Sequence, residues 1–186
     1  MNIRYFVLLF LPVLFLSRCG TTGPKTDYGT AGNAELRALL TPNDPNLSFP
    51  IYSTFDEIAP LFNQTDGRTY VVNFWATWCR PCITEMPYFE RLARETADGD
   101  VQVIMVSLDK PRDIRTKLKD FVSERPLKLP IVSFTDNFYD GWLYKVDESW
   151  TGSIPVTLIY RDGKQKFNKG SISSYRELQG LVRTVE

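Results

Sequence analysis

The sequence contains no histidine. This absence excludes every catalytic pair in which an imidazole activates a serine or a cysteine, and it removes the commonest metal ligand in proteins. Only three cysteines are present, so a structural zinc site would need carboxylates to complete its ligand set. We therefore expect no metal site in the native fold.

A surplus of basic residues is also missing. Lysine and arginine together number 22, and aspartate and glutamate together number 22. Nucleic-acid binding depends on positive charge that neutralises phosphates, so we expect no nucleic-acid partner. The rest of the composition, 43% hydrophobic and 24% charged, is that of a globular chain long enough for one ordinary domain plus a leader.

Residues 1–18 predict a signal peptide for export. Arg4 supplies the positive charge, and an apolar run interrupted only by Pro12 extends over residues 5–16. This run is too short to cross a bilayer comfortably, which takes about 20 residues, but it fits the hydrophobic region of a secretory signal. An uncleaved anchor or a buried core helix is the alternative interpretation.

The leader ends in Leu16-Ser17-Arg18-Cys19, which resembles a bacterial lipobox. Such a motif has a leucine three residues before the cysteine that becomes lipidated, and Arg18 departs from the small residue that usually precedes the cysteine. Lipidation at Cys19 also leaves two cysteines in one motif and no odd free thiol in an oxidising compartment. Cleavage by an ordinary signal peptidase, or a leader that stays attached, is the alternative. We expect a bacterial protein on the periplasmic side, anchored to the membrane by lipid at Cys19.

The rest of the chain divides into a tether and one domain. Glycine, proline and small polar residues are frequent in residues 19–50, which predicts a lipid-anchored tether with at most a weak helix over 34–40. The domain is expected over residues 51–186, with strands at 70–75, 101–108, 129–134, 157–160 and 164–169. Helices are expected after Ser53 and at 82–96, 112–124, 136–145 and 174–185. This order predicts an α/β domain with a mixed central sheet.

Cys79-Arg80-Pro81-Cys82 is the motif that carries chemistry. It follows a buried strand and opens a helix, which is the setting of a redox-active pair of cysteines. Cys79 lies at the helix N-terminus, where unpaired N–H groups and the helix dipole stabilise a thiolate. We therefore expect Cys79 to be the exposed nucleophile and Cys82 the shielded resolving thiol. A haem attachment site would need histidine where Ile83 stands, and a purely structural disulfide would close too small a loop to stabilise much.

The segment from Val71 to Cys82, VVNFWATWCRPC, resembles the active-site segment of the thioredoxin superfamily. Glu85, Pro87 and the segment from Gly152 to Thr157 continue the resemblance, which covers about residues 68–186. The subgroup that it most resembles is the membrane-tethered TlpA/ResA type of thiol-disulfide oxidoreductase. The resemblance implies a thioredoxin-like fold, a mixed sheet flanked by helices, and disulfide exchange with protein substrates. It says little about which substrates these are.

The resemblance also implies roles for residues outside the cysteine motif. It implies a cis peptide bond before Pro155, packed beside the disulfide, which leaves the backbone of Ile154 free to pair with an extended substrate. It places Glu85 under the active site, where burial would raise its pKa and suit it to exchange protons with the thiols. A solvent-exposed helix glutamate is the alternative. The usual thioredoxin has aspartate at the position of Asn73, and an amide cannot titrate, so Glu85 becomes the better candidate for proton transfer.

The charge and the aromatic rings around the motif suggest a substrate face. Arg80 is expected to lower the pKa of Cys79 and to stabilise the reduced form, unless its side chain points into water and is screened. Three further tryptophans fit a core role as well as a groove near the site: Trp75, Trp142 and Trp150. The expected substrate-binding residues are Trp78, Arg80, Pro81, Ile154 and Pro155.

The function we expect is reduction of disulfides in exported proteins, for which the resemblance suggests roles in cytochrome c maturation or thiol homeostasis. Such an enzyme needs no cofactor, but an upstream membrane electron donor must re-reduce its cysteines. A disulfide oxidase or isomerase is the first alternative, because direction depends on the potentials of the partners. A thioredoxin-like binding module with structural cysteines is the second. A copper chaperone is disfavoured by the absence of histidine and the presence of only three methionines.

Overall fold

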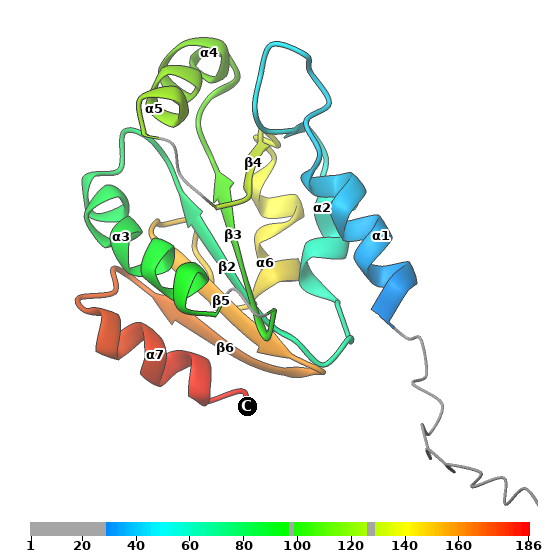
Figure 1. The fold of residues 1–186 in the computed structure, drawn as a ribbon. Coiled ribbons are helices and arrows are strands. Elements are labelled where there is room, and N and C mark those ends of the chain that lie inside the picture. Colours follow the sequence, from blue (N-terminus) through cyan, green and yellow to red (C-terminus); the bar gives the residue numbers. More distant parts are fainter. Residues whose placement is uncertain (1–28, 97–98, 126–128) are drawn as a thin grey trace, which may run out of the picture.

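The structure is a computed structural model that describes residues 29–96, 99–125 and 129–186. Within this described part, six strands form one sheet (Figure 1). The strands are β1 (Ile51–Tyr52), β2 (Thr69–Trp75), β3 (Val101–Ser107), β4 (Ile131–Phe134), β5 (Val156–Arg161) and β6 (Lys164–Lys169). The α-helices are α1 (Gly29–Leu40), α2 (Phe55–Ile58), α3 (Arg80–Glu95), α4 (Pro111–Asp113), α5 (Lys119–Glu124), α6 (Leu143–Val146) and α7 (Tyr175–Arg183).

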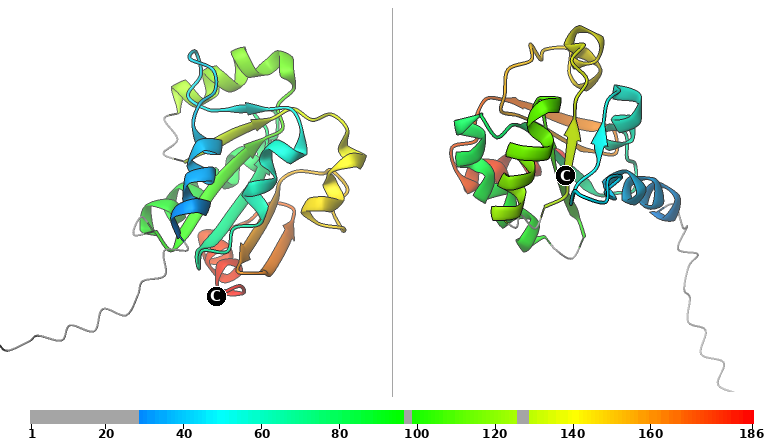
Figure 2. Two further views of the ribbon diagram at one scale, coloured as in Figure 1. Left: turned by 90° about the vertical axis from the view of Figure 1, so that its right-hand side faces the viewer. Right: turned by 90° about the horizontal axis from the view of Figure 1, so that it is seen from above.

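The sheet is mixed, as the order of the elements predicts. Its strands lie in the order β1-β4-β3-β2-β5-β6. The first four are parallel to one another, whereas β5 is antiparallel to both of its neighbours, β2 and β6. The turn between β5 and β6 has Asp162 and Gly163 at φ values of 46° and 86°, which is the type I′ conformation expected of a tight hairpin. The predicted mixed sheet flanked by helices is confirmed, with helices on both of its faces (Figure 2).

Strand β2 lies in the middle of the sheet and is buried along its whole length. Its side chains alternate between two apolar clusters, because successive residues of a strand point to opposite faces. Val71 and Trp75 belong to the cluster that α3, α5 and α7 cover, and Tyr70, Val72 and Phe74 belong to the cluster that α1, α2 and α6 cover. Both faces of the strand are therefore apolar, which explains its nearly continuous run of hydrophobic residues.

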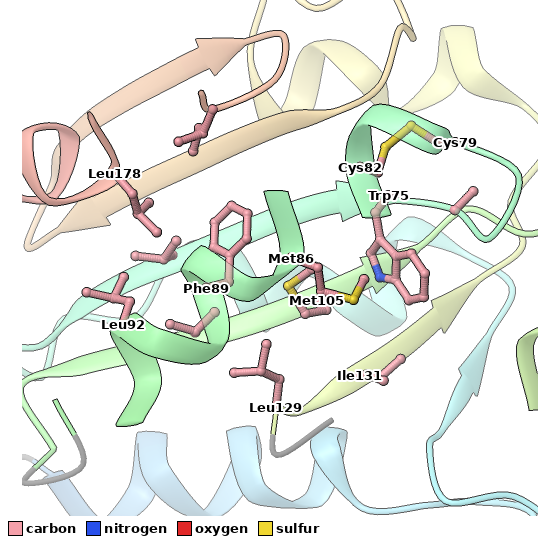
Figure 3. Close-up of a cluster of buried hydrophobic side chains, with 14 of the residues drawn as sticks. Trp75, Cys79, Cys82, Met86, Phe89, Leu92, Met105, Leu129, Ile131 and Leu178 are labelled. Atoms are coloured by element: carbon pink, nitrogen blue, oxygen red, sulfur yellow. A yellow bond between two sulfur atoms is a disulfide. The ribbon is translucent and has the colours of Figure 1, made fainter. Parts of the chain in front are cut away.

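Helix α3 carries the cysteine motif and packs one side against the sheet. Cys82, Met86, Phe89 and Leu92 recur at helical spacing and are all at most 3% exposed (Figure 3). The helix continues past Pro87 to Glu95, as the apolar periodicity predicts. The burial of this stripe fixes which side of the helix faces the core, and thereby fixes the direction of Cys82.

The helix expected after Ser53 is shorter than an ordinary helix. Thr54 and Glu57 form a capping box at its start, but the α-helical hydrogen bonding ends at Ile58 and a 3-10 turn over Ala59–Phe62 follows. Pro60 explains this ending, because a proline has no backbone N–H to donate within a helix. The helix expected over 112–124 likewise divides into α4, a π-helical segment over Ile114–Leu118, and α5.

The fold includes residues before the expected domain start at residue 51. Leu36 and Leu39 of α1 join the cluster under α2, and Leu47 and Phe49 join the cluster under α3. The predicted signal peptide and Cys19 lie outside the described residues. In the part of the chain that the structure describes, no helix combines the length and hydrophobicity needed to span a membrane.

Candidate active site

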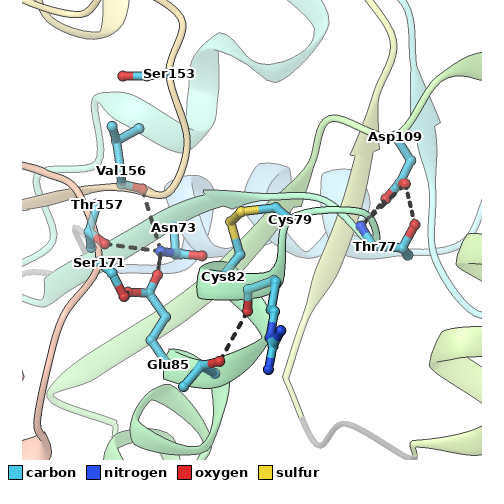
Figure 4. Close-up of a disulfide and its surroundings, with 12 residues drawn as sticks. Asn73, Thr77, Cys79, Cys82, Glu85, Asp109, Ser153, Val156, Thr157 and Ser171 are labelled. Carbon is cyan, nitrogen blue, oxygen red and sulfur yellow. Dashed lines mark hydrogen bonds between the residues drawn. A yellow bond between two sulfur atoms is a disulfide. The ribbon is translucent and has the colours of Figure 1, made fainter.

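Cys79 and Cys82 form a disulfide at the start of α3, with their Cα atoms 5.3 Å apart (Figure 4). Cys79 is the N-cap residue, and its carbonyl accepts a hydrogen bond of 3.2 Å from the backbone N–H of Ile83. Cys79 is 5% exposed and Cys82 is 0% exposed. The prediction that Cys79 is more accessible than Cys82 is confirmed. The expectation of an exposed Cys79 is wrong for the disulfide state, because both cysteines are part of the apolar cluster that includes Trp75.

The loop between β2 and Cys79 is fixed by a buried carboxylate. Asp109 is 1% exposed, and it accepts hydrogen bonds from the backbone N–H of Thr77 at 3.0 Å and from the Thr77 hydroxyl at 2.6 Å. The Ser107 hydroxyl donates a further bond of 2.8 Å. Three donors converge on this carboxylate, so Asp109 holds the backbone that presents Trp78 and Cys79.

Sequence reasoning missed Asp109. The available signal was its place directly after an apolar strand: β2 and β3 are parallel, and Trp75 is paired with Ser107. The carboxyl ends of parallel strands meet at one edge of a sheet, where sites commonly form. A polar residue just after β3 therefore had to lie beside the loop that follows β2.

Glu85 lies one turn after Cys82 on the same helix and is 0% exposed. Its Oε2 accepts hydrogen bonds from the backbone N–H of Ile172 at 2.6 Å and from the Ser171 hydroxyl at 3.2 Å. Its Oε1 accepts a hydrogen bond of 3.0 Å from Asn73 Nδ2. The alternative of a solvent-exposed helix glutamate is thereby excluded.

Burial raises the pKa of the Glu85 carboxyl above its ordinary value. The hydrogen bonds from Ile172, Asn73 and Ser171 act in the opposite direction, because they favour the charged form, but they do not cancel the effect of burial. The predicted raised pKa is confirmed in direction. A buried carboxyl with a raised pKa can take up and release a proton at a pH where ordinary glutamates stay ionised.

Asn73 connects this carboxylate to the sheet. It is 0% exposed. Its Nδ2, which donates to Glu85, also lies 3.0 Å from Thr157 Oγ1 and 3.4 Å from the carbonyl oxygen of Val156. Its Oδ1 is buried and has no hydrogen-bond partner among the described residues. Figure 4 shows Asn73 between Glu85 and the disulfide. The side chain that stands where thioredoxins have an aspartate is therefore a direct partner of the candidate proton carrier.

The residues predicted to bind substrate differ in exposure. Trp78 is 62% exposed, and Arg80 and Pro81 are also exposed. Pro155 is buried and Ile154 is half-buried. The peptide bond between these two is cis, as the resemblance predicts. Pro155 directly precedes Val156, whose carbonyl oxygen lies 3.4 Å from Asn73 Nδ2, and Ile154 packs against the apolar cluster that contains both cysteines.

The remaining tryptophans belong to the core. Trp75 is 0% exposed, Trp142 is 1% exposed and Trp150 is 4% exposed. The rings of Trp142 and Trp150 lie 5.4 Å apart, and Trp150 lies 4.5 Å from Phe74. Of the two interpretations that the sequence left open, the core role is correct for all three.

Comparison with known proteins places these features in a family. Residues 55–164 match the AhpC/TSA family. Thiol-disulfide oxidoreductase ResA of Bacillus thuringiensis (strain Al Hakam) is 33% identical over 179 residues, which cover 96% of this chain and 96% of that protein. Thioredoxin-like protein YneN of Bacillus subtilis (strain 168) is 36% identical over 120 residues, which cover 64% of this chain and 68% of that protein.

The fold is also found among solved structures. The thioredoxin-related protein from Neisseria meningitidis serogroup B superposes with a TM-score of 0.55 at 23% sequence identity. The match covers 65% of this chain and 87% of that chain. At this identity the likeness concerns the fold, and it confirms the predicted thioredoxin-like architecture.

Proposed function

The chain belongs to the AhpC/TSA family and is a thiol-disulfide oxidoreductase of the ResA type, and from this premise we propose that it acts as a reductase of disulfides in exported proteins. The observation that carries the proposal is the buried Glu85 carboxyl one helical turn after Cys82 on α3. As part of this proposal, Cys79 is the nucleophile, Cys82 is the resolving thiol and Glu85 is the proton carrier.

Reduction needs a proton acceptor near the resolving cysteine. A thiol that is shielded from water stays protonated, because burial disfavours the thiolate. Cys82 is 0% exposed, so it must lose its proton to a neighbouring group before it attacks. Glu85 is one turn away on the same face of α3, and its raised pKa lets it hold that proton.

The proposed cycle begins with the reduced enzyme. The Cys79 thiolate attacks one sulfur of a substrate disulfide, which forms a mixed disulfide and releases the other substrate sulfur as a thiolate. Cys82 then gives its proton to Glu85 and attacks the Cys79 sulfur. The second substrate sulfur leaves as a thiolate, and the substrate has gained two electrons. The enzyme is left with the Cys79–Cys82 disulfide, which an electron donor must reduce.

The proposed substrate face combines the loop before α3 with the cis peptide segment. Trp78 offers an exposed aromatic surface beside Cys79, next to Arg80 and Pro81. The Ile154–Pro155 segment supplies backbone groups against which an extended substrate can pair. Such pairing suits many sequences, which fits an enzyme that acts on several exported proteins.

We further propose that the enzyme works at a membrane surface outside the cytoplasm. The support is the signal-like segment over residues 1–18 and the lipobox-like ending at Cys19. Lipid at Cys19 and the residues that follow it would hold the thioredoxin-like fold near a membrane electron donor. Cytochrome c maturation and thiol homeostasis are the processes in which such a reductase would serve.

Insulin reduction tests the proposed activity. The chain with dithiothreitol as donor should reduce insulin disulfides faster than dithiothreitol alone, and Cys79→Ser should remove the whole acceleration. The absence of acceleration by the unaltered chain would favour the alternative of a binding module whose cysteines are structural.

A further inference from the structure

We propose that a groove between α3 and the end of α5 binds an acidic segment of the protein whose disulfide is exchanged. The groove has a volume of about 560 Å³, and its lining includes Trp78 and Arg80, the two residues that flank Cys79. The proposal rests on the proposed function, because it names the kind of partner that the same cysteines meet. It adds a determinant of specificity that lies outside the cis-proline segment.

The floor of the groove is apolar. Its apolar lining comes from Ile83 and Pro87 of α3 and from Phe121 of α5. Phe121 and Ile83 are half-buried, and Pro87 is exposed. The Phe121 ring lies 5.3 Å from the ring of Trp75 in the core, which holds this wall in place. An aliphatic or aromatic side chain of a partner can therefore remove apolar surface from water here.

The rim of the groove is positively charged. Arg80 stands at the start of α3, and Arg125 follows the end of α5. Arg125 lies over the face of Phe121, with its guanidinium carbon 5.2 Å from the ring centroid, so the charge is held at the edge of the apolar floor. Within residues 29–96, 99–125 and 129–186, no carboxylate lies within 4.0 Å of either guanidinium, and no acidic residue lines the groove.

These charges are local, because the whole chain has equal numbers of acidic and basic residues. A partner therefore meets positive charge at the groove that the net charge of the molecule does not reinforce. The occupant that matches the floor and the rim is a peptide segment with an apolar side chain and a carboxylate. Since Trp78 and Arg80 flank Cys79, this segment is the stretch next to the partner's reacting cysteine.

Two synthetic peptides test the groove. Each carries one cysteine as a mixed disulfide with 2-thiopyridine and a neighbouring leucine, and the two differ only in having three aspartates or three lysines beside the leucine. The reduced chain attacks the peptide sulfur and releases 2-thiopyridone, whose absorbance gives the second-order rate constant. Cys19→Ser in every protein removes the third thiol.

We expect the aspartate peptide to react about fivefold faster than the lysine peptide at low salt, and the ratio to approach one at about 1 M salt. Arg125→Glu should bring the ratio to one or below. Lys119→Glu is the matched control, because it makes the same change of charge at an exposed residue of α5 that lies outside the groove. This variant should keep most of the preference for the aspartate peptide.

Equal rates for the two peptides with the unaltered chain would overturn the proposed groove while leaving the oxidoreductase function intact. A preference that survives Arg125→Glu as well as it survives Lys119→Glu would also overturn it. The salt dependence is measured on the unaltered chain and needs no variant to fold. A reduced chain that attacks neither peptide would contradict both the groove and the proposed function.

Discussion

Asn73 on β2 donates a hydrogen bond of 3.0 Å to Glu85 on α3, although neither side chain has any exposed surface. The bond joins the central strand to the helix that carries both cysteines. It also places an uncharged partner next to a carboxyl whose pKa is raised by burial. Asn73 cannot titrate, so Glu85 is the ionisable member of this pair, and the consequences of protonating it can be tested without a second charge in the same hydrogen bond.

Replacing Glu85 with glutamine should slow disulfide reduction by about 100-fold, which is the lower end of the rate loss seen when a positioned proton carrier is removed. The rate should also lose the pH dependence that follows Glu85, because glutamine does not titrate. The measurement is the pH profile of insulin reduction. Glu90→Gln on the same helix is the control and should change little. An unaltered rate and pH profile in Glu85→Gln would mean that protons reach Cys82 by another route.

The same substitution should change how stability depends on pH. Because the folded-state pKa of Glu85 is raised above its ordinary value of 4.5, the folded chain binds this proton more tightly than the unfolded chain. The resulting contribution to the free energy of unfolding is fully present below about pH 4.5 and is lost as pH rises through the raised pKa. Urea unfolding should show that Glu85→Gln becomes more stable relative to the unaltered chain as pH rises from 4.5 through the raised pKa of Glu85. A constant difference over this range would contradict the assignment.

Replacing Asp109 with alanine should destabilise the chain by about 2 kcal/mol, because the donors of Thr77 and Ser107 would lose a charged acceptor. The loop that presents Cys79 should also become less well fixed, so the rate of disulfide exchange should fall. Asp109→Asn keeps one oxygen acceptor and should cost less on both measures. Unfolding in urea and the insulin assay measure the two effects, and equal losses for alanine and asparagine would refute the role of the carboxylate.

Cys82→Ser should trap partner proteins on Cys79, because serine cannot resolve the mixed disulfide. The complexes should be visible on a non-reducing gel after expression in a bacterial host, and dithiothreitol should release them. Cys79→Ser is the control and should trap none. Failure of Cys82→Ser to trap any protein would argue against Cys79 as the nucleophile.

The parts of the site that lie close together along the chain could be predicted from the sequence. Cys79, Cys82 and Glu85 follow one another at intervals of three residues, from the N-cap of α3 into its first turns. Helical geometry alone therefore places Cys82 and Glu85 on one face. The cis peptide bond before Pro155 followed from the family resemblance. The spacing of apolar residues also gave the main strands and α3, because each of these is long enough for its periodicity to be read.

The parts that depend on tertiary contacts could not be predicted. The place of Asp109 after an apolar strand made it a candidate, but its bonds to Thr77 depend on the pairing of β2 with β3, which no local pattern specifies. The burial of Trp142 and Trp150 depends on their packing against Phe74 and each other. β1 contains two residues, which is too short for an alternating pattern to be recognised.

The reduction potential of the Cys79–Cys82 pair tests the central claim most directly. It is measured by equilibrating the chain with glutathione or dithiothreitol buffers, with Cys19→Ser to leave only this pair. We predict a value near that of thioredoxin, about −270 mV, which would make the chain a reductase that depends on a dedicated donor. A value near about −120 mV would make it an oxidant and would contradict the proposed direction.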